Sequence, residues 1–201
     1  MIVVVEGVSA AGKTAWCARH ATATIPELAP VTPPNGDTAT VAQFWTDAHC
    51  CRWLEAEQAE EKYGTAYCDT DPWKLHYPWC LWQLGYATAE AWTAAAAATR
   101  AAIQARTMGF ADTVLFLEPD PAVVRRQKEN DPTRRRGSFE RHLQLGPALR
   151  AWYETIERLS PNHVVWHGER VKEAIHVPPK ADRFSVELFD EIVATATRHF
   201  Q

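Results

Sequence analysis

The 201-residue chain lacks the features of an exported or membrane-spanning protein. No apolar run is as long as a membrane-spanning helix, and the short apolar run at the N-terminus ends at Glu6 without a basic leader. The five cysteines form no CxxC pair and have no zinc-binding spacing. Because an odd number of cysteines without a secretion signal is typical of reduced thiols, the sequence predicts a cytoplasmic protein.

A strong charge of one sign is also missing. The 21 basic and 25 acidic residues give a formal net charge of −4, and the composition is globular. A mildly acidic chain is not suited to coating nucleic acid, so neither nucleic acid nor a membrane is expected as a partner. The length predicts one domain over residues 1–201, and the sequence is compatible with a homodimer.

Short apolar segments alternate with helical patterns along the chain. A helix is expected to begin after Asp37, a good N-cap, and to end near Gly64. Its apolar residues recur at helical spacing: Val41, Phe44, Trp45, Ala48, Cys51 and Leu54. Further helices are predicted over 13–20, 87–106, 147–159 and 186–199, and strands over 1–7, 22–27, 64–69, 112–118 and 162–168. This alternation predicts a parallel sheet with helices on both faces.

One motif is specific on its own. "GVSAAGKT", residues 7–14, matches G-x4-G-K-[ST] in full and lies between a predicted strand and a predicted helix. Its glycines let the backbone N–H groups surround phosphates, Lys13 reaches the β and γ oxygens, and Thr14 offers its hydroxyl to Mg²⁺. The sequence therefore predicts ATP and Mg²⁺ as cofactors. The predicted nucleotide-binding residues of the loop are Gly7, Ser9, Ala10, Ala11, Gly12, Lys13 and Thr14.

Nucleotide binding does not name the reaction. The chain has no [NT]KxD guanine-recognition tetrapeptide and no LSGGQ-like signature of transporter ATPases. Three functions stay open: a kinase for a small acceptor, an NTP-hydrolysing switch or accessory ATPase that controls a partner, and a nucleotide-binding module that holds RNA.

Several segments resemble the thymidylate kinase and deoxynucleoside kinase families. "VVVEGVSAAGKT" (3–14) resembles their opening, and "GFADTVLFLEPDPAVVRRQ" (109–127) resembles their fourth strand and the helix that leads into a lid. "RRRGSF" (134–139) stands where that lid would be, and "HVVWHGERVKEAI" (163–175) resembles their last strand. The resemblance implies a three-layer α/β fold with a five-stranded parallel sheet of order 2-3-1-4-5. It also implies a lid at about 125–140 and phosphoryl transfer to a nucleoside, a nucleotide or a specialised metabolite such as an antibiotic.

The predicted lid is rich in arginine. A phosphoryl group in transfer carries negative charge on its equatorial oxygens, and guanidinium groups stabilise that charge. Arg134, Arg135 and Arg136 are therefore candidate catalytic residues, and Arg126 is a candidate contact for the nucleotide. A solvated basic helix face and a patch for RNA are the alternatives.

Candidate acids follow the predicted strands. Asp69 ends a strand that should neighbour the phosphate loop, where a carboxylate can hold Mg²⁺ or its waters. Glu118, at the end of another predicted strand, is the alternative candidate for this role at the metal. Asp71 could face the same crevice as a general base, or it could only begin a turn with the proline that follows. Deoxynucleoside kinases place a catalytic glutamate after their second strand, and this resemblance makes Glu27 a second candidate base.

The families named above carry Asp-Arg or Glu-Arg where this chain has "DTD" (69–71), a pattern that resembles shikimate and ribosylnicotinamide kinases instead. The acceptor therefore stays open. A dense aromatic stretch follows, and it suits either core packing or the wall of an acceptor pocket. Trp73, Lys74 and His76 are the candidate pocket residues from this stretch.

Overall fold

Five parallel strands form one sheet in the computed structural model, which describes residues 1–130, 139–166 and 182–198. The strands are β1 (Ile2–Glu6), β2 (Thr24–Ile25), β3 (Ala66–Asp69), β4 (Thr113–Phe116) and β5 (Val164–Trp166). Their order is β2-β3-β1-β4-β5, which confirms the predicted fold class. Val5 pairs with Asp69, and Glu6 pairs with Phe116, so the carboxyl ends of the three central strands lie at one edge.

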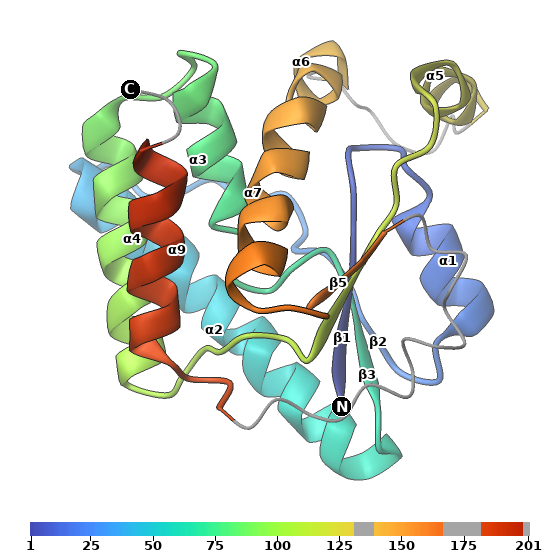
Figure 1. Ribbon diagram of the computed structural model, residues 1–201, viewed down its shortest axis with the longest axis horizontal. Coiled ribbons are helices and arrows are strands. Elements are labelled where there is room, and N and C mark those ends of the chain that lie inside the picture. The colour runs from blue at the N-terminus through green and yellow to red at the C-terminus, as the bar shows by residue number, and fades with distance from the viewer. Residues whose placement is uncertain (131–138, 167–181, 199–201) are drawn as a thin grey trace.

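Helices cover both faces of the sheet (Figure 1). The described helices are α1 (Lys13–His20), α2 (Thr38–Tyr63), α3 (His76–Gln83), α4 (Ala89–Gln104), α5 (Pro121–Glu129), α6 (Phe139–Gln144), α7 (Gly146–Leu159) and α9 (Val186–Arg198). Side chains of β1 alternate between two cores because successive residues of a strand point to opposite faces. Val3 and Val5 pack with Trp16 of α1, whereas Ile2 and Val4 belong to the larger core on the other face.

The predicted helix boundaries agree closely with the structure. The Asp37 carboxylate caps α2 by accepting a hydrogen bond from the Thr40 N–H at 2.8 Å. Gly64 ends the same helix at φ 77°, a left-handed conformation that glycine adopts without strain. Ser185 precedes α9, and its hydroxyl oxygen accepts from the Leu188 N–H at 3.1 Å. Local capping chemistry therefore fixed these helix ends.

The residues buried along α2 are not the apolar residues that recur at helical spacing. The six that recur at helical spacing are all half-buried or exposed, and Leu54 is 54% exposed. The residues buried along α2 are Ala42, Thr46, His49, Arg52, Trp53 and Ala56. Half of these buried residues are polar, and hydrogen bonds to backbone carbonyls explain the burial of Arg52.

Two helices were not predicted. The aromatic stretch after β3 forms α3, which packs against α4 and α7, and the short α6 packs against α7. Among the described residues, no helix combines the length and the apolar character that crossing a bilayer requires.

Candidate active site

The phosphate loop curls tightly between β1 and α1. Gly7 lies at φ 150°, and a Cβ at this position would be 2.4 Å from the Leu117 carbonyl oxygen. Gly12 lies at φ 93° and forms the N-cap of α1. The Ala11 N–H donates to the Val8 carbonyl oxygen at 3.0 Å and closes the curve. Both glycines of the motif are therefore needed for the backbone path.

The side chains that follow the loop are those that a triphosphate and its metal require. Lys13 donates from Nζ to the carbonyl oxygens of Gly7 at 2.8 Å and Val8 at 3.2 Å. The Thr14 hydroxyl donates to Asp69 Oδ2 at 2.5 Å, which links the loop to the end of β3. Mg²⁺ in kinase sites is usually held by one or two protein groups together with phosphates and water. Thr14 and Asp69 fit that requirement.

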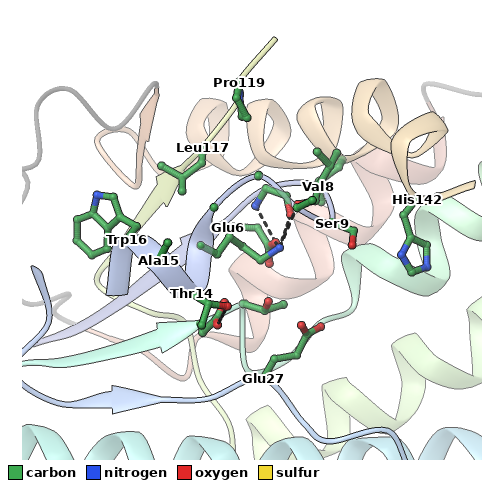
Figure 2. A pocket seen from close by; sticks show the side chains of 18 of the residues that line it. Glu6, Val8, Ser9, Thr14, Ala15, Trp16, Glu27, Leu117, Pro119 and His142 are labelled. Atoms are coloured by element: carbon green, nitrogen blue, oxygen red, sulfur yellow. Dashed lines mark hydrogen bonds and ion pairs between the residues drawn. The ribbon is translucent and has the colours of Figure 1, made fainter. Parts of the chain in front are cut away.

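These residues line one cleft of about 1350 Å³ at the carboxyl edge of the sheet. All seven predicted loop residues line it, together with Glu27, Asp69, Lys74 and His76. Figure 2 shows the phosphate loop in the middle of this cleft, with Thr14 and Glu27 on one side and His142 on another. No cluster of three or more His, Cys, Asp or Glu side chains that could hold a metal occurs among the described residues.

No family model matches the chain, and no curated protein matches its sequence. Among solved structures it is similar to deoxyadenosine kinase from M. mycoides with the products dCMP and a flexible dCDP bound. The TM-score is 0.55 at 12% sequence identity, over 99% of this chain and 100% of that one. The chain therefore shares the fold of that kinase. At this identity the likeness establishes the fold and leaves the activity to be argued from the site.

Glu6 lies directly before the phosphate loop, at the end of β1. It is 1% exposed, and its carboxylate accepts from the Gly7 N–H at 2.8 Å and the Asp71 N–H at 3.0 Å. Its Oε1 lies 4.0 Å from Lys13 Nζ, and its Oε2 lies 3.6 Å from His76 Nε2. Glu6 therefore ties the start of the phosphate loop to the turn after β3.

The structure does not bring Asp71 to the cleft. The side chain is 2% exposed and points into the core, where Oδ2 accepts from Trp73 Nε1 at 2.9 Å and from the Tyr153 hydroxyl at 3.0 Å. Burial, together with the nearby Glu6 carboxylate, raises the pKa of Asp71 to about 7. The reason for the inward direction is the backbone: β3 ends at Asp69, and Thr70 follows at φ 75°. Asp71 is consequently not retained as the general base.

Of the three candidate pocket residues, Trp73 is in the core as well. It is 5% exposed, and its ring centroid lies 4.8 Å from that of Phe110 and 5.7 Å from that of Phe189. Aromatic packing therefore accounts for Trp73. Lys74 and His76 do line the cleft.

His76 lines the cleft with a neutral ring. Its Nδ1 lies 3.4 Å from the Tyr153 hydroxyl, so both ring nitrogens already face polar groups of the protein. Burial, reinforced by the Lys74 and Lys13 cations, holds the pKa of His76 well below its usual range. His76 thus acts as a polar wall of the cleft.

Glu27 projects into the cleft from the segment after β2 and pairs with Lys74. Burial alone would raise the pKa of the Glu27 carboxyl, but Lys74, Lys13 and Arg52 outweigh it and lower the pKa to about 2. Glu27 is therefore an ionised carboxylate near the phosphate loop, and it is the candidate base that the structure places in the cleft.

The remaining predicted site residues differ in their relation to the cleft. Glu118 lines the cleft but pairs with Arg150, whereas Asp69 contacts Thr14, so Asp69 is the better candidate for the metal. Arg126 is exposed on α5 and does not line the cleft, although Gln127 of the same helix does. The lid arginines Arg134, Arg135 and Arg136 lie outside the described residues.

Sequence reasoning missed four residues of this region. Arg52 is 3% exposed and donates hydrogen bonds to the carbonyl oxygens of Pro26, Asp69, Thr70 and Asp71. Tyr77 and His142 meet across the cleft wall, with the Tyr77 hydroxyl 3.2 Å from His142 Nε2. Glu6 had a signal, since it ends the first strand directly before the motif, and Tyr77 belongs to the aromatic stretch that was a candidate wall of the acceptor pocket. Arg52 and His142 had no signal in the sequence.

Proposed function

We propose that the chain is an ATP-dependent phosphotransferase that moves the γ-phosphoryl group to a hydroxyl of a small neutral acceptor. The observation that carries this proposal is the shared cleft of Glu27 and the phosphate loop. Its volume of about 1350 Å³ exceeds the roughly 300–1,000 Å³ of most small-molecule pockets, which leaves room for a nucleotide and an acceptor together.

The chain's own groups support the steps of such a transfer. Glu27 accepts the hydroxyl proton as the acceptor oxygen forms its bond to phosphorus and the bond to the ADP oxygen breaks. Lys13 and the loop amides hold the phosphates. Mg²⁺, held by Thr14 and Asp69, would neutralise part of the charge on the phosphates. Arg134, Arg135 and Arg136 stay predicted to stabilise the charge of the group in transfer.

A hydroxyl acceptor suits this site better than a phosphate. The ionised Glu27 carboxylate would repel a phosphate dianion, whereas it can accept a hydrogen bond from a hydroxyl. The fold likeness to a deoxyadenosine kinase favours nucleosides as the first acceptors to try.

The test is ADP release in the presence of ATP and Mg²⁺, measured with and without each member of a panel of nucleosides, nucleotides, sugars and hydroxylated antibiotics. At least one hydroxyl acceptor should stimulate ADP release and gain a phosphate by mass spectrometry. Glu27→Gln should lower that rate roughly 10²- to 10⁴-fold, whereas Glu55→Gln, a change at an exposed position of α2, should not.

The same assay can also refute the proposed function. ADP release that no acceptor stimulates, and that survives Glu27→Gln, would refute the proposal. It would favour the NTP-hydrolysing switch or accessory ATPase.

A further inference from the structure

Two segments form the acceptor side of the cleft, and their tips meet. Glu27 follows β2, Lys74 lies in the turn between β3 and α3, and their side chains form an ion pair. Lys74 adopts φ 43°, and Thr70 of the same turn adopts φ 75°, although neither is glycine. Strained backbone of this kind is tolerated where the surroundings fix it, and it is common at functional sites.

The bases of the same two segments are fixed by Arg52. Its Nε donates to the Pro26 carbonyl oxygen at 2.9 Å, next to Glu27 in sequence. Its Nη2 donates to the carbonyl oxygens of Asp69 and Thr70, each at 2.9 Å. The buried guanidinium of Arg52 thus sets the spacing of the two backbones. The ion pair between Glu27 and Lys74 is not needed to hold these backbones in place.

Stability does not explain the ion pair either. The Lys74 side chain is 25% exposed and the Glu27 side chain is 41% exposed. Partly exposed pairs of long side chains contribute little to stability, since solvent screens them and ordering them costs entropy. A role in the chemistry of the cleft is the better explanation.

We propose that Lys74 is a positioning residue for phosphoryl transfer, which holds the Glu27 carboxylate ionised and directed toward the acceptor. The proposal rests on the function proposed above. It goes beyond that function because it assigns the control of the base to one cation.

The charges around Glu27 agree with this role. Lys74 is the strongest of the cations that lower the pKa of Glu27, ahead of Lys13 and Arg52. Among the described residues, His49, His76, Tyr77 and His142 also interact electrostatically with Glu27. Burial lowers the pKa of each of these histidines, so they stay neutral near pH 7 and leave Lys74 as the main partner.

A weak base suits this reaction. The transition state of phosphoryl transfer is loose, and little of the hydroxyl bond has broken when the barrier is reached. The direction of the carboxylate then matters more than its basicity, because small misplacements of a catalytic group are costly. A cation that lowers basicity while it fixes direction is therefore consistent with catalysis.

The first experiment measures Glu27 directly and needs no acceptor. The carboxyl carbon of Glu27 is followed by ¹³C NMR between pH 3 and 7 at low salt, with Glu27→Gln as the assignment standard. In the wild type the signal should stay that of a carboxylate across this range. In Lys74→Met it should titrate within this range, because only Lys13 and Arg52 then oppose the effect of burial on the pKa of Glu27. In Lys74→Arg it should again resemble the wild type. Lys62→Met, the same change at an exposed lysine of α2, is the control.

The second experiment uses whichever acceptor the panel identifies. Lys74→Met should lower kcat/KM for the acceptor by roughly tenfold or more, with the dissociation constant for ATP unchanged. Lys74→Arg should recover most of the loss, and Lys62→Met should behave as the wild type. Circular dichroism at each pH checks that every variant is folded.

The outcomes separate the two proposals. If the wild type phosphorylates an acceptor while Lys74→Met keeps or raises its kcat/KM, the role of Lys74 is refuted and the proposed function stands. An unchanged Glu27 titration in Lys74→Met refutes that role as well. If the wild type phosphorylates nothing in the panel, the proposed function fails, whatever the NMR titration shows.

Discussion

Asp71→Asn separates a structural aspartate from a catalytic one. In the core, Asp71 Oδ2 accepts from Trp73 Nε1 at 2.9 Å and from the Tyr153 hydroxyl at 3.0 Å, and Oδ1 accepts from the Trp73 N–H at 3.3 Å. The substitution keeps the size of the side chain but replaces one acceptor oxygen with an NH₂ group. It therefore tests whether the position matters for folding or for the reaction.

The expected cost follows from these contacts. With its carbonyl oxygen in the place of Oδ2, asparagine keeps both strong bonds and presents its NH₂ group to the Trp73 N–H, at a cost of about 1–3 kcal/mol for an unsatisfied buried donor. Removing the charge offsets part of this cost, because burial and the Glu6 carboxylate raise the pKa of Asp71 to about 7 and so disfavour its charged form. A net loss of about 1 kcal/mol is expected, which lowers Tm by about 2–4 °C in a chain of this size.

The assay pairs stability with turnover. Urea unfolding at pH 7 should show the loss, and kcat per folded molecule should stay within about twofold of the wild type, since typical base removal costs roughly 10²-fold or more. Asp47→Asn is the matched control: Asp47 is exposed on α2 and accepts from Gln43, so its stability should change by less than about 0.5 kcal/mol. Full stability with turnover reduced 10²-fold or more would mean that Asp71 takes part in the reaction.

Three other predictions follow from the contacts of Lys13, Asp69 and Glu60. Lys13→Ala should weaken ATP binding roughly 10- to 100-fold by calorimetry and abolish turnover with an unchanged circular dichroism spectrum; wild-type affinity would contradict the phosphate-loop assignment. Asp69→Asn should raise the Mg²⁺ concentration for half-maximal rate roughly 10- to 100-fold, and an unchanged Mg²⁺ requirement would remove Asp69 from the metal site. Hydrogen bonds from Arg183 lower the pKa of Glu60 to about 2 against the opposing effect of burial, so this carboxylate stabilises the fold above pH 4.5 and the gain is lost as pH falls toward 2. By urea unfolding, the wild type should exceed Glu60→Gln by roughly 1 kcal/mol at pH 7, and the difference should shrink below pH 4.5; a constant difference would contradict the linkage.

Much of the fold was predictable because its signals are local. Caps such as Asp37 and Gly64 act within one helical turn, and a buried strand such as β1 shows its apolar run directly. The strand order came from a family resemblance, since no local rule fixes which parallel strands are neighbours. The helix α3 was missed because its residues, rich in aromatics and with Pro78 in the first turn, gave no clear helical period.

The candidate site was predictable only where a motif fixes the backbone. The loop at 7–14 has one conformation that suits its glycines, so all seven of its predicted residues line the cleft. Asp69 and Asp71 are two residues apart, and an extended strand would direct both side chains to one side. The left-handed backbone conformation of Thr70, between them, breaks that rule, and no residue type in "DTD" predicts such a conformation.

Arg52 shows why hydrophobic periodicity predicted the wrong buried face for α2. The rule assigns charged residues to solvent because an unpaired buried charge is costly. The Arg52 guanidinium avoids that cost through four backbone carbonyls. They come from two segments that are distant in sequence, one directly before Glu27 and the other including Asp69. Those carbonyls converge only after the sheet has formed, so the partners of Arg52 cannot be read from the helix itself. A buried arginine of this kind costs stability that an apolar residue would not. The same hydrogen bonds hold the backbone beside the candidate base Glu27 at a fixed distance from the backbone of the candidate metal ligand Asp69, which an apolar residue could not do.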